Sequence, residues 1–219
     1  MLQFRKDGDD MKDIALTITS GNLELEGVLH LPGTEGRNYP TVVVCHPHSL
    51  YGGDMHNNVV VALCHALTEK GIATLRFNFR GVGASEGCFD EGKGEQDDLR
   101  FAVATLAARK EIDAARLGLA GYSFGGMVAL AAAKGWEQVK CIAAISPVVS
   151  PGAMEGLCLP GYFICGTRDH VVSTELFCSE AAKIKPPGTV ELINGADHFW
   201  AGREGAIAGK VVDFMAGIL

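Results

Sequence analysis

The apolar and polar positions of this chain follow two different periods in turn. Residues 14–19 and 23–31 alternate apolar and polar side chains on either side of Ser20-Gly21-Asn22, which predicts an antiparallel hairpin. Short, β-branched apolar runs predict buried strands at residues 41–45, 72–77, 117–121, 139–146, 159–165 and 189–193. Stretches with helical period predict helices at residues 55–70, 95–109, 124–134, 175–183 and 205–218. Repeated strand–helix units predict an α/β fold, with a mostly parallel twisted sheet covered by helices on both faces.

Length and composition fit one folded unit. The chain has 219 residues, is 47% hydrophobic and shows no internal repeat or linker. We therefore expect residues 13–219 to form a single domain and residues 1–12 to form a flexible tail. The net charge of −7, without a basic cluster, argues against nucleic acid as a partner. No apolar run approaches the ~18 residues of a membrane span, so we expect no membrane partner.

The cysteines bear on the cellular compartment in which the protein is expected. There are seven, an odd number, and no pair has CxxC spacing. Several lie inside apolar runs, as Cys45 and Cys165 do, which is typical of reduced thiols used as small core residues. Together with an N-terminus that lacks the apolar run of a signal peptide, this predicts a cytoplasmic protein.

The most informative segment is residues 117–126, where an apolar strand runs through Gly121-Tyr122-Ser123-Phe124-Gly125 into an alanine-rich helix. The G-x-S-x-G pattern places a serine on a turn so tight that neighbouring side chains would clash, and the glycines remove the clash. The hydroxyl then lies beside a helix N-terminus, which favours developing negative charge. A serine N-cap between glycines is the alternative, but the strand–turn–helix context favours Ser123 as a nucleophile.

A catalytic serine needs a base, and the base needs an acid that orients it. Two loops that directly follow predicted strands offer them, residues 166–169 and 195–199. Active sites of open α/β sheets lie beyond the carboxyl ends of the strands, and the acid precedes the histidine in chain order. We therefore expect Asp169 as the acid and His198 as the base, against the alternative of a surface loop histidine. Asp197 is a rival acid, but a residue adjacent to His198 would struggle to reach its ring nitrogen.

Oxyanion stabilisation requires two backbone N–H groups aimed at the developing alkoxide. We expect one from Phe124, the residue after the nucleophile. We expect the other from the loop at residues 46–53, with His48 preferred and Ser49 or Leu50 as alternatives. The His-x-His pair in this loop lacks a clear third ligand, so we expect no metal.

The glycine-rich segment at residues 81–94 partly matches two nucleotide-binding patterns. It lacks the helix that one pattern requires and the Ser/Thr that holds magnesium in the other, so we expect no cofactor. The simpler interpretation is a mobile loop near the rim of the site. Arg80 is expected to anchor this loop, with binding of a substrate carboxylate as the alternative.

Taken together, these segments resemble the α/β-hydrolase superfamily over nearly the whole chain. More narrowly, the chain looks like the small lidless bacterial hydrolases related to dienelactone hydrolases and short-chain carboxylesterases. The segments that carry the resemblance are His46-Pro47-His48 with Tyr51-Gly52-Gly53, residues 76–83, the turn at Ser123, and the loops with Asp169 and His198. The resemblance implies the α/β-hydrolase fold without a sizeable cap, and a serine hydrolase of the carboxylesterase type. Two departures are Ser123, where dienelactone hydrolases have cysteine, and Ser49, where relatives usually have a second proline.

The stretch between the predicted strands at 139–146 and 159–165 is too short for the helical cap that many lipases insert there. An open site suits small, soluble acyl esters. Aromatic residues on the candidate rim loops are expected either to line an acyl pocket or to pack: Tyr51, Phe89, Phe199 and Trp200.

We therefore expect hydrolysis of small acyl esters through an acyl-enzyme. A thioesterase or small peptidase with the same triad is an alternative. A non-catalytic binding module on the same fold is another, which the intact triad argues against. The sequence leaves the physiological substrate and the oligomeric state open, and a homodimer is compatible with it.

Overall fold

The computed structural model describes residues 11–33 and 38–219. Residues 1–10 of the expected flexible tail lie outside the described residues. Lys12, its last residue, already belongs to the first strand. Eight strands of the described chain form one sheet in the order β1-β2-β4-β3-β5-β6-β7-β8. They are β1 (Lys12–Ser20), β2 (Leu23–Leu31), β3 (Tyr39–Cys45), β4 (Ala73–Phe77), β5 (Ile112–Tyr122), β6 (Val139–Ile145), β7 (Gly161–Gly166) and β8 (Thr189–Ile193). The β1–β2 and β2–β4 pairs are antiparallel and the other pairs are parallel, which confirms the predicted topology.

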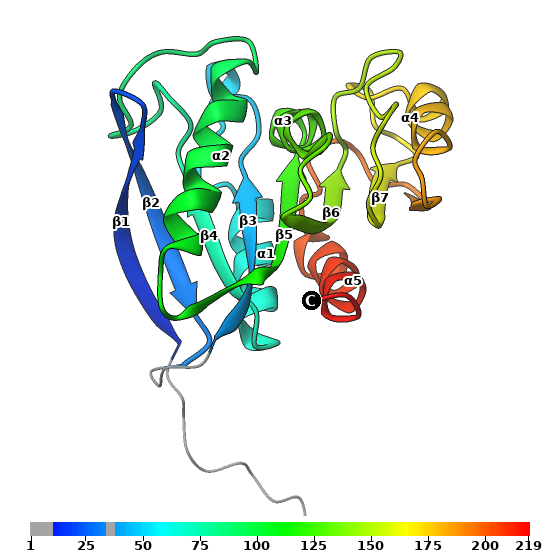
Figure 1. Cartoon of the computed structure of the whole chain (residues 1–219). Coiled ribbons are helices and arrows are strands. Elements are labelled where there is room, and N and C mark those ends of the chain that lie inside the picture. Colours follow the sequence, from blue (N-terminus) through cyan, green and yellow to red (C-terminus); the bar gives the residue numbers. More distant parts are fainter. Residues whose placement is uncertain (1–10, 34–37) are drawn as a thin grey trace, which may run out of the picture.

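Helices cover both faces of the sheet, as Figure 1 shows. One face carries α1 (Asn58–Glu69) and α5 (Glu204–Ala216), which contact each other. The other face carries α2 (Gly94–Ala107), α3 (Phe124–Ala133) and α4 (Thr174–Ala181).

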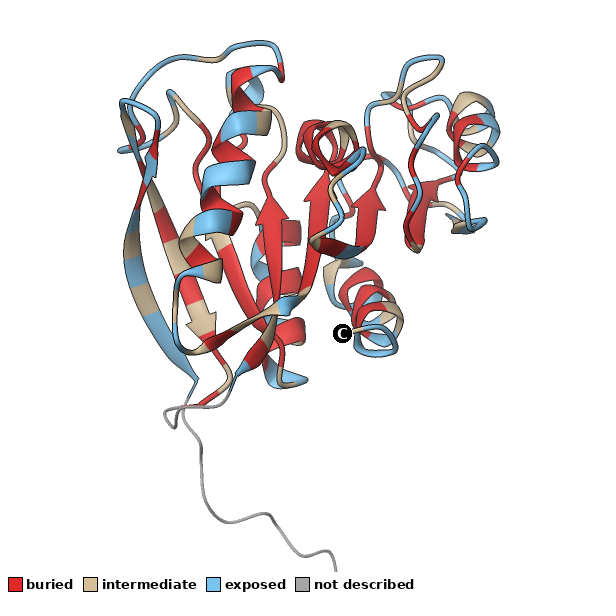
Figure 2. Cartoon of the chain, in the orientation of Figure 1, coloured by how far each residue is buried: buried red, intermediate tan, exposed pale blue. Residues whose placement is uncertain are grey.

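The side chains of strand β3 point alternately into two hydrophobic clusters, one on each face of the sheet. Val43 and Cys45 belong to the cluster under α2, α3 and α4, whereas Val42 and Val44 belong to the cluster under α1 and α5. Because successive strand side chains point to opposite faces, a continuous apolar run is required where both faces are covered. Figure 2 accordingly shows the central strands buried, whereas exposed residues gather on the outer strand β1 and the loops.

Several element boundaries differ from the prediction, most of all that of β5, which begins at Ile112 and not at residue 117. The helix expected from residue 55 begins at Asn58, because the side chain of Asn57 accepts a hydrogen bond from the Val59 N–H at 3.0 Å and caps the first turn. A short 3₁₀ helix over Ser49–Tyr51 follows β3, where only a loop was expected.

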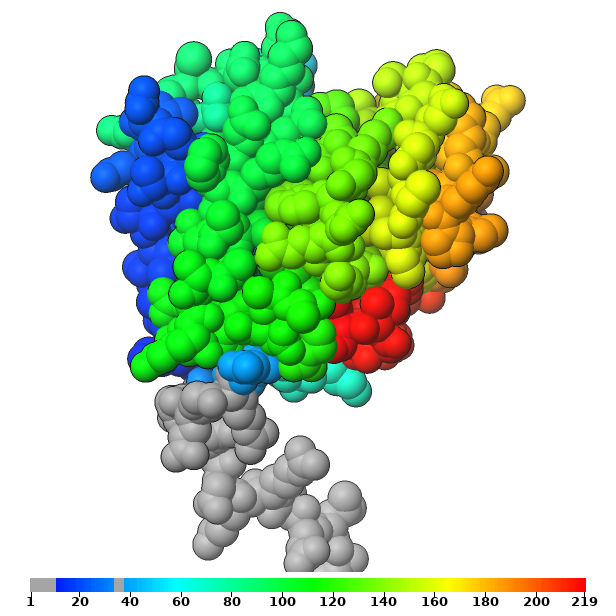
Figure 3. All heavy atoms as spheres, viewed as in Figure 1, coloured from blue at the N-terminus to red at the C-terminus, as the bar shows by residue number. Residues whose placement is uncertain are grey.

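Over the residues that the structure describes, no cap interrupts the sheet. Residues 146–160 between β6 and β7 contain turns and bends only, which confirms the expectation of a lidless fold. The space-filling view in Figure 3 shows the β1–β2 hairpin in blue and α4 in orange at opposite sides of one face. Over residues 11–33 and 38–219, no helix has the length and apolar character needed to cross a bilayer.

The glycine-rich loop after β4 is fastened at both ends. Arg80 donates from Nε and from Nη2 to the two carboxylate oxygens of Asp98, at 3.0 Å and 2.8 Å, as its expected anchoring role requires. The carboxylate of Glu95 accepts from the backbone N–H groups of Asp90 and Gly92, both at 2.8 Å. Buried carboxylates are stable when they are paired in this way. The loop that carries Phe89 is therefore hydrogen-bonded to α2 near both of its ends.

Candidate active site

Ser123 lies on the turn between β5 and α3 with φ +55° and ψ −117°, a conformation that costs a non-glycine residue ~1–3 kcal/mol. The neighbouring glycines make the turn sterically feasible. A Cβ on Gly121 would lie 2.4 Å from the carbonyl oxygen of Gly125. A Cβ on Gly125 would lie 2.4 Å from the carbonyl oxygen of Cys45 at the end of β3. The motif therefore joins three backbone segments that leave no room for side chains.

Ser123, His198 and Asp169 form one hydrogen-bonded chain. The Ser123 Oγ lies 2.9 Å from His198 Nε2, and His198 Nδ1 lies 2.9 Å from Asp169 Oδ2. Both Ser123 and His198 are buried, at 5% and 7% exposure. The sequence thus placed these three residues on loops that do meet, and the geometry suits transfer of the serine proton to the imidazole.

The carboxylate of Asp169 is held as an anion. Its Oδ1 accepts from the backbone N–H groups of Val171 and Val172, each at 2.9 Å. Burial acts to raise its pKa, but hydrogen bonds from His198, Val172, Ser146 and Val171 outweigh burial and hold that pKa at about 2. An ionised carboxylate accepts hydrogen bonds only, so the His198 Nδ1 carries the proton and Nε2 is the acceptor that faces Ser123.

The rival acid, Asp197, points elsewhere. Its Oδ1 accepts from the backbone N–H groups of Phe199 at 3.0 Å and Trp200 at 3.2 Å, so its side chain closes a turn within its own loop. The structure therefore brings Asp169, and not Asp197, to the ring of His198.

Two neighbours of the triad were missed by sequence reasoning. The Tyr122 hydroxyl donates to the backbone carbonyl of His198 at 2.7 Å, which ties the histidine loop to the nucleophile turn. Ser146 directly follows β6, is fully buried, and its Oγ accepts from the Trp200 Nε1–H at 3.2 Å. Only their positions in the sequence could have indicated these two residues. Tyr122 lies inside the G-x-S-x-G motif, and Ser146 lies at the carboxyl end of a predicted strand.

The two residues that are expected to supply the oxyanion donors have neighbouring side chains. The rings of His48 and Phe124 are 4.8 Å apart. The Phe124 N–H is the first of α3, where a helix offers no internal acceptor. Within the part of the chain that the structure describes, neither the Phe124 N–H nor the His48 N–H donates to a protein acceptor.

His46 supports the loop that carries His48. It is fully buried, its Nε2 accepts from the Phe79 N–H at 3.0 Å, and its Nδ1 therefore donates to the Pro47 carbonyl at 2.7 Å. Both ring nitrogens are thus used within the protein, which leaves no lone pair for a His-x-His metal pair. Among the described residues, no group of three or more His, Cys, Asp or Glu could hold a metal ion.

Of the four candidate pocket aromatics, three reach the surface near the site. Tyr51 is 88% exposed and lies 4.9 Å from the His48 ring, and the half-buried Phe89 lies 4.8 Å from the same ring. Phe199 is 68% exposed, and its ring lies 5.8 Å from that of His198. Trp200 has no exposed surface and packs in the cluster under α1 and α5, so of the two alternatives, lining a pocket or packing, the packing alternative holds for this residue.

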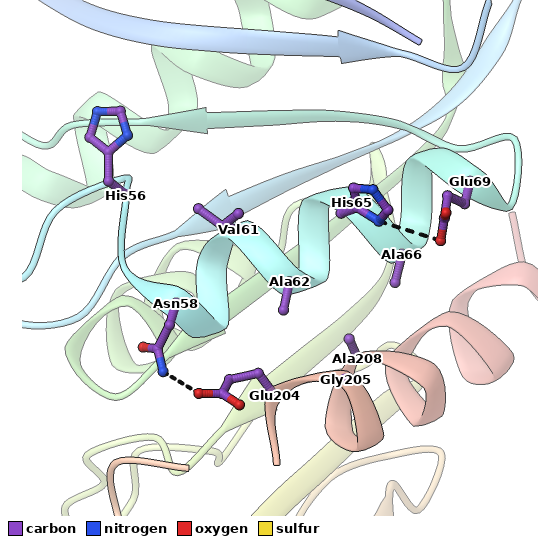
Figure 4. Close-up of a pocket in the computed structure, with 10 residues that line it drawn as sticks. All are labelled: His56, Asn58, Val61, Ala62, His65, Ala66, Glu69, Glu204, Gly205 and Ala208. Carbon is purple, nitrogen blue, oxygen red and sulfur yellow. Dashed lines mark hydrogen bonds and ion pairs between the residues drawn. The ribbon is translucent and has the colours of Figure 1, made fainter. Parts of the chain in front are cut away.

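A groove on the surface lies away from these residues. It runs between α1 and α5, and Figure 4 shows Asn58 bound to Glu204 at one end and His65 paired with Glu69 at the other. Its floor is formed by small side chains, among them Ala62, Ala66 and Ala208. None of its lining residues belongs to the Ser123 site.

The fold and this site define the class of α/β serine hydrolases, and comparison with known proteins agrees. A lidless α/β serine hydrolase of Xanthomonas campestris is 32% identical and superposes with a TM-score of 0.84 over 94% of each chain. A dienelactone hydrolase of Anabaena variabilis shares the fold, with a TM-score of 0.80 over 95% of this chain and 99% of that one at 19% identity.

Comparisons of the amino-acid sequence identify the family within this class. The profile of the X-Pro dipeptidyl-peptidase family (S15 family) matches residues 21–178. An uncharacterized protein of Rickettsia prowazekii is 30% identical over 211 residues, which cover 85% of this chain and 87% of that protein. The esterase FrsA of Yersinia pestis is 28% identical over 145 residues, 64% of this chain but only 32% of that esterase. The chain belongs to the S15 family of α/β serine hydrolases, and it is a hydrolase of the lidless, esterase-like kind.

Burial of His46 makes stability depend on pH. Burial lowers its pKa from 6.5 to about 4. Between these values the unfolded chain binds a proton that the folded chain does not, so the free energy of unfolding falls as pH falls through this window. The full contribution, present above pH 6.5, is ~3 kcal/mol. Urea unfolding at pH 7.5 and pH 5 should show a smaller loss of stability in His46→Asn than in the native protein. His65→Gln, at an exposed histidine, should keep the native pH dependence, and an unchanged slope in His46→Asn would contradict this role.

Proposed function

We propose that this protein hydrolyses small, soluble acyl esters by acyl transfer to Ser123. The observation that carries the proposal is the hydrogen-bonded chain from Ser123 through His198 to Asp169, set beside the N-terminus of α3. Such a chain activates a hydroxyl that is a weak nucleophile on its own.

In the first step, the Ser123 oxygen attacks the ester carbonyl while His198 Nε2 takes its proton. The N–H groups of Phe124 and His48 stabilise the oxyanion of the tetrahedral intermediate. The intermediate collapses, the alcohol leaves with the proton from His198, and the acyl group stays on Ser123. Water then attacks the acyl-enzyme with His198 again as base, which releases the acid and restores the serine.

The open site and its exposed aromatics support a small acyl group. Without a cap, the acyl chain contacts only the rim, for which we propose Tyr51, Phe89 and Phe199. The name of the matched Yersinia esterase supports ester chemistry.

Peptide hydrolysis is the second candidate, because the matched family is described as an X-Pro dipeptidyl-peptidase. The same triad would act on an amide. Gly-Pro-p-nitroanilide tests it directly against p-nitrophenyl esters and the corresponding thioesters. We further propose that the enzyme acts on a small molecule in the cytoplasm without a cofactor.

The nucleophile is tested with a fluorophosphonate probe and p-nitrophenyl acetate. Native protein should be labelled, and Ser123→Ala should lose labelling and at least ~10³-fold in kcat, because the attacking oxygen is gone. Ser179→Ala, at an exposed serine on α4, is the matched control and should behave as native protein. Hydrolysis by Ser123→Ala at the native rate would exclude the assignment. Absence of label on native protein would favour a binding module.

The acid is tested by two matched substitutions. Asp169→Asn should lower kcat by ~10³-fold or more, because the amide favours the wrong tautomer of His198 and removes the negative charge. Asp197→Asn should keep kcat within about threefold of native, since asparagine supports the same turn. Steady-state kinetics with p-nitrophenyl acetate measure both. A larger loss in Asp197→Asn than in Asp169→Asn would reverse the assignment.

The rim is tested by acyl length. Phe199→Ala should raise KM for p-nitrophenyl butyrate by about three- to tenfold and leave the acetate little changed, because only the longer chain contacts the lost apolar surface. Tyr51→Ala should act in the same direction. Phe101→Ala, an exposed phenylalanine on α2, controls for general loss of apolar surface. Equal effects on acetate and butyrate would argue against an acyl pocket at this rim.

A further inference from the structure

The loop that carries the base is attached to neighbouring strand ends on both sides of His198. Before the histidine, the Ala196 carbonyl accepts from the Arg168 N–H of the acid loop at 2.9 Å. After the histidine, the Trp200 Nε1–H donates to the Ser146 Oγ, directly after β6, at 3.2 Å. Neither of these hydrogen bonds involves His198 itself, so the position of the base depends on a further contact.

That contact comes from the strand that carries the nucleophile. The Tyr122 hydroxyl donates to the backbone carbonyl of His198 at 2.7 Å. Among the described residues, no other group donates to this carbonyl. Because Tyr122 directly precedes Ser123 in the chain, the hydrogen bond joins the neighbour of the nucleophile to the backbone of the base.

The pleat of β5 explains why the Tyr122 side chain reaches this loop. Tyr122 is the last residue of β5, and with Ala120 it belongs to the cluster under α1 and α5. Ala196 and Trp200 belong to the same cluster, so the loop packs on the face of the sheet to which Tyr122 points. The Tyr122 ring lies 5.6 Å from the His198 ring, with 37° between their planes.

A phenylalanine would fill the same apolar space, so the hydroxyl of Tyr122 needs its own explanation. The residue is 4% exposed, and a buried hydroxyl costs free energy unless it is hydrogen-bonded. Burial, with the charges of Asp169 and Asp197, raises the pKa of Tyr122, so its hydroxyl stays protonated. A backbone carbonyl only accepts, and the hydroxyl is therefore the donor in this contact.

We propose that Tyr122 is a positioning residue that holds His198 Nε2 at hydrogen-bond distance from the Ser123 Oγ. This inference rests on the proposed function. The Tyr122 hydroxyl acts on the backbone of His198, whereas Asp169 acts on its ring, so the two contacts fix different parts of one residue. Without the hydroxyl, the ring keeps its bond to Asp169 but the backbone that carries it is released.

The hydroxyl is tested by Tyr122→Phe, which keeps the ring. The kcat for p-nitrophenyl acetate should fall by about three- to tenfold, the value of one neutral hydrogen bond, with KM within about twofold of native. p-Nitrophenyl butyrate should show the same fall, because a contact that acts through His198 is indifferent to acyl length. The rate constant of fluorophosphonate labelling should fall in parallel. The final extent of labelling counts the folded enzyme, so kcat is referred to active molecules only.

Tyr162→Phe is the matched control. Tyr162 belongs to the same cluster, its hydroxyl is hydrogen-bonded to Glu191, and it lies near the start of β7, at the end of the strand away from the acid loop. This variant also loses a buried hydroxyl and should unfold at a lower temperature than native protein. Its kcat and labelling rate per folded molecule should stay native, because its hydrogen bond does not reach the base.

Native kcat in Tyr122→Phe would overturn the proposal, as would equal losses of kcat in the two tyrosine variants. The outcome is distinguishable from a failure of the proposed function. If native protein is neither labelled nor active, the proposed function fails. If native protein is active, Ser123→Ala is inactive and Tyr122→Phe equals native, only the role of Tyr122 fails.

Discussion

The turn at Ser123 depends on the contact of three backbone segments without intervening side chains. The end of β5, the start of α3 and the end of β3 approach so closely that a methyl group at Gly121 or Gly125 would overlap a carbonyl oxygen. This contact aims the serine hydroxyl away from the sheet. It also holds the end of β3, which leads into the loop with His48, against the nucleophile turn. The nucleophile turn, the start of α3 and the end of β3 are therefore held together by one steric constraint.

The polar groups around the site are arranged so that each has a defined role as donor or acceptor. His46 is held neutral by burial, with both nitrogens bonded to backbone. Asp169 is held ionised by several donors in spite of burial. The neutral His46 beneath the loop with His48 and the ionised Asp169 bonded to His198 thus have fixed donor and acceptor roles, and a preorganised site requires such fixed roles.

Much of this arrangement could be predicted from the sequence because it follows from periodicity and chain order. The parallel strands, the hairpin and the convergence of Ser123, Asp169 and His198 all derive from strand ends that share one edge of a sheet. The sequence could not decide between pocket and packing for Trp200, because a loop aromatic gives no sign of which face it will occupy, and the structure places it in the core. Ser146 was missed because a serine after a strand is common, and its side-chain partner, Trp200, lies on a distant loop.

The carboxylate of Asp98 links distant parts of the chain. It accepts from Ser20 in the hairpin at 2.8 Å and from both the backbone and the side chain of Arg80 in the loop after β4. The N-terminal hairpin is therefore more than an edge that extends the sheet. It braces, through one buried anion, the loop on which Phe89 approaches His48. Sequence variation in the first strand can consequently reach the mouth of the site without altering any residue that borders it.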